Sequence, residues 1–198
     1  MAIIKAKAGS LAPAQEREIE DAIDRARRMS DRVWGRWSKI YGQVGRRRRK
    51  RRLRVDEWKS SPPFMEWFGW RALRNGQFNK VNRRLRKVRR TLQRGDEIKV
   101  IYNGSSAPFC CSKVAWNGGF RRGRIHVCNG FFVEDAQEQA TTIVHEMVHA
   151  TGISQWGQPG RGGGNSGNYR ERASHTPRKA RRNPYNYERL FVDFDPGP

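Results

Sequence analysis

Thr-Thr-Ile-Val-His-Glu-Met-Val-His-Ala-Thr-Gly, residues 141–152, is the stretch that decides how the rest of the chain is interpreted, because it contains the pattern His-Glu-x-x-His. On a helix, His145 and His149 lie one turn apart on the same face, so their imidazoles can bind one ion from the same side. Zn²⁺ suits neutral nitrogen ligands and an open coordination position. Glu146 lies beside them, where it can accept a proton from a water molecule at the metal, as a general base does.

A five-residue pattern of this kind also arises by chance, so its surroundings must place it on a helix. Asp135 and Glu138 form a capping box at the point where such a helix would begin. Ala140 and Ile143 begin an apolar face at helical spacing, and Gly152 is a natural C-terminal stop. These signals predict that the pattern lies late in an amphipathic helix, as a metal site requires.

The composition predicts one domain with a modest core. The chain has 198 residues, of which 36% are hydrophobic, with seven Trp and nine Phe. No apolar run approaches the roughly 20 residues that cross a bilayer, and the first ten residues lack the apolar region of a secretory signal. We expect a flexible lead over residues 1–10 and a single domain over 11–198. We also expect a protein made in the cytoplasm and exported by a specialised machine as a toxin or effector, or one associated with a phage.

A net charge of +22 indicates an anionic partner, such as nucleic acid, anionic lipid or an acidic protein. Residues 46–54 form a run of basic side chains, which predicts a loop at about 45–60 that either contacts an anion or is simply solvated. A second basic surface is expected on the outer face of a helix over residues 78–92. The candidate anion-binding residues of the two regions are Arg48, Arg49, Arg84, Arg86, Lys87 and Arg90.

The remaining pattern predicts an α+β fold, helix-rich, with a small antiparallel sheet before the motif helix. A long helix is expected from residue 14 to about 41, and the aromatic run over 64–70 is expected in the core. Strands are expected at 98–102, 114–116 and 124–128, the last two as a hairpin. Of the three cysteines, Cys128 is expected to form a disulfide with one of the adjacent pair at 110–111.

The order of these elements resembles the aspzincin metallopeptidases, which include the deuterolysins and the lysine-specific peptidyl-Lys metallo-endopeptidases. The resemblance extends from about residue 11 to 192. It is carried by residues 125–132, by 142–149, and by 177–188, which is similar to the family's closing Pro-x-Lys-Ala-x-x-Asn-x-x-Asn-x-Glu. It implies a zincin-like metalloprotease fold and an endopeptidase whose zinc is bound by two histidines and an aspartate.

The chain departs from the family at the third zinc ligand. No aspartate occurs between Ala150 and Val192, and Ser166 or a neighbour stands where the aspartate is expected. Catalytic zinc sites use three protein ligands, so a replacement is needed. His175 is the best replacement on ligand chemistry, and Glu171 is an alternative. A further alternative is that the third ligand is lost and the site is degenerate.

The resemblance also implies roles for three other residues. Tyr169 matches the family tyrosine that stabilises the tetrahedral intermediate. Glu188 matches one of the acidic residues that receive the ammonium group of a substrate lysine, and Tyr185 stands where a second acidic residue is expected. The resemblance therefore implies a weakened preference for lysine at the substrate-binding site.

Two functions follow from these observations. The first is a zinc-dependent endopeptidase that cleaves protein substrates, with the substrate antiparallel along the strand before the motif helix and Glu146 as the base. The alternative is a catalytically degenerate zincin-fold protein that binds nucleic acid or another polyanion through its basic surface. Salt-dependent nucleic-acid binding that survives zinc removal would favour the alternative.

Overall fold

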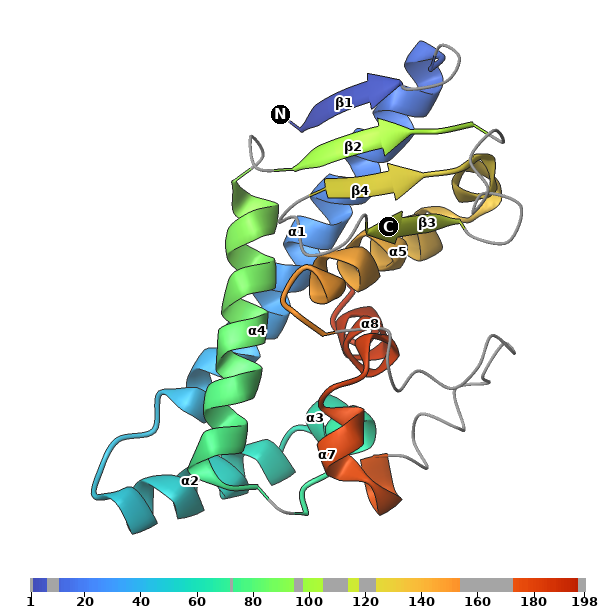
Figure 1. Ribbon diagram of the computed structural model, residues 1–198. Coiled ribbons are helices and arrows are strands. Elements are labelled where there is room, and N and C mark those ends of the chain that lie inside the picture. The colour runs from blue at the N-terminus through green and yellow to red at the C-terminus, as the bar shows by residue number, and fades with distance from the viewer. Residues whose placement is uncertain are drawn as a thin grey trace.

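The computed structural model describes residues 2–6, 11–71, 73–94, 98–104, 114–117, 124–153 and 173–195. A small sheet lies at one end of the molecule, and helices pack against it and extend away from it (Figure 1). The helices are α1 (Pro13–Tyr41), α2 (Arg47–Lys59), α3 (Pro62–Phe68), α4 (Asn75–Gln93), the 3-10 helix η2 (Asn129–Val133), α5 (Ala136–His149), α7 (Pro177–Ala180) and α8 (Pro184–Val192). None of the described helices has the length and apolar character that a membrane span requires.

The two long helices α1 and α4 confirm the predictions from apolar spacing. Each buries a stripe of side chains that recurs every three or four residues, including Ile19, Ile23 and Ala26 in α1 and Phe78 and Val81 in α4. The two helices pack against each other, and α1 also packs against α5. Together they form a frame that runs from the sheet to the opposite end of the molecule (Figure 1).

The sheet confirms the three predicted strands, but it is mixed rather than antiparallel. Its order is β1 (Ile3–Ala6), β2 (Lys99–Tyr102), β4 (Arg124–Val127) and β3 (Ala115–Asn117). β3 pairs antiparallel with β4, as the hairpin signal predicts, whereas β1–β2 and β2–β4 are parallel. Local turn signals determine only the hairpin, and the parallel pairing depends on contacts between distant segments.

The strand β1 corrects the expectation of a flexible lead for residues 3–6, while residues 7–10 lie outside the described residues. It pairs with β2 from Ile3 opposite Lys99 to Ala6 opposite Tyr102, and the Ile3 amide donates to the Ile98 carbonyl at 2.9 Å. An N-terminal strand of this kind is held by backbone pairing with a distant strand, so its own short sequence gives little indication of it.

Helix α2 corrects the expectation of a basic loop at 45–60. The run of like charges is helical because its C-terminal half is anchored in the core. Trp58 is fully buried and its Nε1 donates to the Gly69 carbonyl at 3.1 Å. Arg54 is also buried, donates to the Tyr41 carbonyl at 3.0 Å through Nε, and stacks on the Tyr41 ring. These contacts outweigh the repulsion between the exposed arginines of the N-terminal half.

The aromatic run over 64–70 lies mainly in the core, as predicted. Phe64 and Phe68 are fully buried beside Trp58, and Trp37 of α1 packs against Phe64 with ring centroids 5.7 Å apart. Trp70, at the end of the run, is 46% exposed. Phe78 of α4 packs against Trp37 and Trp58, so the aromatic cluster joins α1, α2, α3 and α4. These helices meet at the end of the molecule away from the sheet (Figure 1).

Candidate metal centre

Helix α5 begins at the predicted cap and carries the motif on its last turns. The Asp135 side chain accepts hydrogen bonds from the backbone amides of Gln137 and Glu138, both at 2.8 Å. The helix packs between α1 and α8, and its buried residues include Ala140 and Ile143 of the predicted apolar face. The helix is therefore fixed along its length, and so is the spacing of the motif side chains.

The two histidines of the motif face each other. Their Nε2 atoms lie 3.1 Å apart, and the ring centroids lie 4.9 Å apart at an interplanar angle of 69°. Glu146, which is 6% exposed, joins them in a group whose potential ligand atoms all lie within 4.8 Å of one another. One turn of helix thus brings two nitrogens and a carboxylate to one place, as the sequence predicts.

The other ring nitrogen of each histidine contacts a hydrogen-bond acceptor. Nδ1 of His145 lies 3.0 Å from Oε2 of Glu188, and Nδ1 of His149 lies 2.9 Å from the Ile153 carbonyl oxygen. A carbonyl or carboxylate oxygen requires a donor, so each neutral imidazole carries its proton on Nδ1 and a lone pair on Nε2. The geometry therefore assigns the same tautomer to both rings.

Two lone pairs that face each other at 3.1 Å need a cation between or beside them. Two Zn–N bonds of about 2.0–2.1 Å at a tetrahedral angle place two nitrogens roughly 3.3 Å apart, close to the observed separation. Partners on the outer ring nitrogens are also the usual arrangement of metal-binding histidines. The donors of His145 and His149 therefore fit a zinc ion.

The acceptor for His149 is placed by a turn that only glycine adopts readily. Gly152 has a φ of +90°, in the left-handed region, and its amide donates to the His149 carbonyl at 2.9 Å. The chain turns back at this point and brings the Ile153 carbonyl to His149. Gly152 was predicted only as a helix stop, and it also orients one imidazole.

The acceptor for His145 is placed by helix α8. Asn183 caps this helix by accepting from the Tyr185 amide at 3.1 Å, and the Asn186 side chain donates to the Trp67 carbonyl of α3 at 2.7 Å. Glu188 then reaches His145, and the Tyr185 ring packs against the His145 ring with centroids 4.5 Å apart. The two predicted substrate-binding residues thus lie at the metal centre and contact one of its histidines.

Burial and neighbouring carboxylates shift the pKa values of the groups around the histidines. Burial lowers the pKa of His145, but the hydrogen bond with Glu188 and the charges of Glu146 and Glu188 outweigh it, so that this pKa is raised. Burial and the same two carboxylates raise the pKa of Tyr185. Burial raises the pKa of Glu134 to about 7, with smaller contributions from neighbouring carboxylates, although a hydrogen bond from Thr142 opposes the shift.

Of the residues proposed to complete the site, only His175 lies among the described residues. It is exposed, in a helical turn over residues 173–175, and is not part of the group formed by the motif residues. This turn packs closely on Gly69, where an added Cβ would lie 2.1 Å from the Ala173 carbonyl oxygen. Glu171 and Tyr169 lie outside the described residues. The assignment of the third ligand stays a prediction.

The predicted anion-binding residues fall into two groups. Arg48 and Arg49 on α2 and Arg86 and Arg90 on α4 are exposed. Arg84 and Lys87 on α4 instead donate to backbone carbonyls, Arg84 to Arg181 at 2.5 Å and Lys87 to Ala150 at 2.6 Å. Their position next to the buried face of α4 explains why they reach inward, and Lys87 thereby links α4 to the C-terminal end of α5.

A helix with this donor set, packed beside a small mixed sheet, places the protein in the class of zinc-dependent peptidases. Comparison with known proteins narrows the class. A family model described as lysine-specific metallo-endopeptidase matches residues 56–192, which is more than half of the chain. The chain therefore belongs to the aspzincin family, and its cofactor is zinc.

The fold supports the same assignment. The structure is similar to that of a zinc peptidase from Grifola frondosa, with a TM-score of 0.64 at 16% sequence identity. The similarity covers 92% of this chain and 97% of the other. No curated protein matches the sequence. Since the identity is low, the structural similarity establishes the fold, a helix-rich α+β metalloprotease fold.

Proposed function

We propose that this chain is an active zinc endopeptidase in which Glu146 is the general base and His145 and His149 bind the metal. The observation that carries the proposal is the pair of Nε2 atoms 3.1 Å apart, each on a ring whose Nδ1 is held by an acceptor. Such outer partners fix the tautomer and raise the basicity of the ligating nitrogen. A binding surface with no catalytic role has no need of this arrangement.

The residues of the proposed site have separate tasks in peptide hydrolysis. Zinc, when bound, supplies a Lewis acid that polarises the scissile carbonyl and lowers the pKa of water. Glu146 accepts the proton of the attacking water and later delivers it to the leaving amine. Glu188 and the Ile153 carbonyl hold the two imidazoles in orientation. Tyr169 is proposed to donate a hydrogen bond to the carbonyl oxygen as it becomes negative.

The edge of the sheet offers a place for the substrate backbone. β4, which precedes the motif helix, is paired on one side with β2 and on the other with β3. The described sheet has two edge strands, β1 and β3 (Ala115–Asn117), and of these β3 is the one that packs against α5 (Figure 1). An extended peptide adds to such an edge through main-chain hydrogen bonds. We place the substrate along β3 rather than along β4.

The preference for lysine is proposed to be weak. The closing segment offers one carboxylate, Glu188, at the position of the family's acidic residues, and this carboxylate already contacts His145 at 3.0 Å. Tyr185 offers no negative charge in its neutral form. The ammonium group of a substrate lysine would therefore have to share the Glu188 carboxylate with His145.

The test uses the Glu146→Gln variant with Glu138→Gln as a matched control. Glu138 is an exposed carboxylate on the same helix, so the control removes the same charge outside the motif. We expect cleavage of an unstructured protein such as casein to fall by about 10²–10⁴-fold in Glu146→Gln, the usual contribution of a general base. Zinc content, measured on the same samples, should stay unchanged in both variants.

Unchanged cleavage in Glu146→Gln would contradict the mechanism. If the wild-type protein neither retains zinc nor cleaves peptides, the degenerate alternative from the sequence is favoured instead. A protein that retains zinc and loses cleavage only with Glu146 confirms the proposal.

A further inference from the structure

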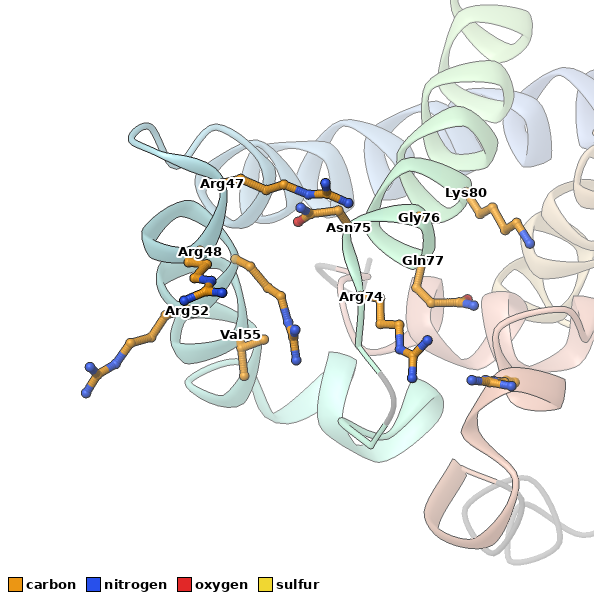
Figure 2. A pocket seen from close by; sticks show the side chains of 11 residues that line it. Arg47, Arg48, Arg52, Val55, Arg74, Asn75, Gly76, Gln77 and Lys80 are labelled. Carbon is orange, nitrogen blue, oxygen red and sulfur yellow. The ribbon is translucent and has the colours of Figure 1, made fainter.

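A cavity with a basic lining lies at the N-terminal end of α4 (Figure 2). This end of α4 is remote from the sheet (Figure 1). Its volume is about 870 Å³, and it lies between α2, the first turns of α4, and α7. Figure 2 shows side chains of α2 and side chains from the start of α4 approaching it from two sides. The lining residues are Arg47, Arg48, Arg51, Arg52, Val55, Arg74, Asn75, Gly76, Gln77, Lys80 and Arg178.

The residues that line the cavity carry positive charges and no negative charge. Six of these residues are arginines, one is a lysine and none is acidic. In the part of the chain that the structure describes, none of the seven takes part in an ion pair. The positive charges are therefore concentrated around one hollow.

Arginines elsewhere in the structure behave differently. Arg25 pairs with Asp195 at 2.7 Å, and Arg36 pairs with Glu57 at 3.3 Å. Arg181 is almost fully buried and donates to the Phe68 carbonyl at 3.0 Å. Arginines that stabilise the fold thus have acceptors within the protein, whereas the arginines that line the cavity have no ion-pair partner among the described residues.

The local helix geometry adds positive potential at the same place. Both α2 and α4 begin at the cavity, and neither has an acidic residue in its first turn. A helix N-terminus carries a partial positive charge, so arginines there are unfavourable without an anion. Arg47 and Arg51 also lie four residues apart on one helix, as do Arg48 and Arg52, and such like-charged pairs destabilise a helix.

The lining also indicates the chemistry of the ligand. Guanidinium groups bind phosphate oxygens through paired hydrogen bonds, and several arginines around one hollow suit several phosphates. Among the described residues, none that lines the cavity has an aromatic side chain on which a nucleic-acid base could stack. The volume lies within the range of about 300–1,000 Å³ that is usual for small-molecule sites.

We propose that this cavity binds a small molecule that carries several phosphate groups, such as an inositol polyphosphate or a short polyphosphate chain. The site contains none of the residues of the metal centre, and the proposal does not depend on peptidase activity. Its elements are the four lining arginines of α2, Arg74 and Lys80 at the start of α4, and Arg178 of α7.

Titration calorimetry on the zinc-loaded protein tests the site with three probes: inositol hexakisphosphate, tripolyphosphate and inorganic phosphate. The double variant Arg51→Gln/Arg74→Gln removes one exposed cation from each of two sides of the cavity. Arg86→Gln/Arg90→Gln removes the same charge from the exposed face of α4 outside it. We expect the first variant to weaken inositol hexakisphosphate or tripolyphosphate binding by about tenfold or more, because charge-assisted bidentate bonds are lost. The second variant should change it by less than about twofold, because exposed charges at a distance are screened.

Three results would overturn the proposal. The first is the absence of binding by all three probes at physiological salt. The second is an equal loss of affinity in both variants, which indicates attraction by overall charge. The third is a single-stranded oligonucleotide that displaces inositol hexakisphosphate at equal phosphate concentration, which identifies a nucleic-acid surface instead. Tighter binding of inositol hexakisphosphate indicates a compact ring of phosphates, and tighter binding of tripolyphosphate indicates a linear chain, whereas tightest binding of inorganic phosphate would contradict a site for several phosphates.

Discussion

The metal centre and the basic cavity are two regions in which charges of one sign lie close together, carboxylates in the first and guanidinium groups in the second. The two regions differ in how the repulsion between like charges can be reduced. Beside the metal centre, Glu134 lies close enough to Glu188 to interact with it, and the pKa of Glu134 rises to about 7, mainly through burial. A carboxyl group with such a pKa takes up a proton near neutral pH, so this region can lower its own charge. Arginine stays protonated at any physiological pH, so the cavity cannot. Like charges that cannot be titrated away need a partner from outside.

The largest effect on the acidic side is expected for the third metal ligand. If His175 is that ligand, His175→Ala should lower zinc affinity by more than about hundredfold, beyond the 10–100-fold typical of outer partners. Glu171→Ala is the matched variant for the other candidate, and competition with a chromogenic chelator measures both. His175 is exposed and does not belong to the group formed by His145, Glu146 and His149, so a loss of zinc affinity in His175→Ala would be strong support for its role as a ligand. Unchanged affinity in both variants would mean that neither residue binds zinc.

A smaller effect is expected for Glu188, whose carboxylate contacts Nδ1 of His145. Glu188→Gln keeps an acceptor of similar shape but removes the charge, so zinc affinity or kcat should fall by about 10–100-fold. Glu138→Gln again serves as the control, because it removes an exposed carboxylate from the same helix. Should zinc affinity stay constant while only the preference for lysine substrates changes, Glu188 would be a substrate-binding residue, as the family resemblance implies, rather than a positioning residue.

The sequence predicts the parts of the site that depend on local contacts, but not the parts that depend on contacts between distant segments. The cap at Asp135, the spacing of His145 and His149 and the stop at Gly152 are local signals, and they placed α5 and its motif correctly. The partners that orient the histidines come from the Ile153 carbonyl and from Glu188, which is 43 residues from His145. A backbone carbonyl leaves no mark in a residue pattern, and the family resemblance pointed to Glu188 with a different role.

Contacts between distant segments also account for the two errors in secondary structure. The charges of α2 and the shortness of β1 favour irregular structure when each segment is considered alone. Trp58 buried in the aromatic core and the pairing of β1 with β2 override these local preferences. The basic cavity could not be predicted for the same reason, because its arginines come from three separate segments that only the fold brings together.

The titration of Glu134 gives a prediction for stability. Its pKa rises from 4.5 to about 7 on folding. Between these values the folded state binds more protons than the unfolded state, so this contribution to stability is complete below about pH 4.5 and is lost as pH rises towards 7. Glu134→Gln resembles the protonated form and avoids the loss. Its Tm relative to wild type should therefore be higher at pH 8 than at pH 5, by about 2–4 °C after allowance for partial exposure.

The control for this measurement is Asp21→Asn, which removes a charge from the exposed face of α1. Its Tm difference from wild type should show no such rise between pH 5 and pH 8. An equal rise in both variants would attribute the effect to the overall charge rather than to the surroundings of Glu134.

The smallest effect is expected at the basic cavity without any ligand. Repulsion between its cations is strong only where salt does not screen it, since the Debye length falls from about 30 Å at 0.01 M to about 8 Å at 0.15 M. Arg51→Gln/Arg74→Gln should therefore raise the Tm by roughly 2 °C at the lower salt concentration and leave it unchanged at the higher one.

Arg17→Gln/Arg28→Gln is the matched pair on α1, where both arginines are exposed among acidic neighbours. That pair should lower the Tm at low salt, because it removes attraction instead of repulsion. If both pairs raise the Tm, overall charge is the cause. If neither pair changes it, the arginines of the cavity do not repel one another measurably, and the contrast with the metal centre fails.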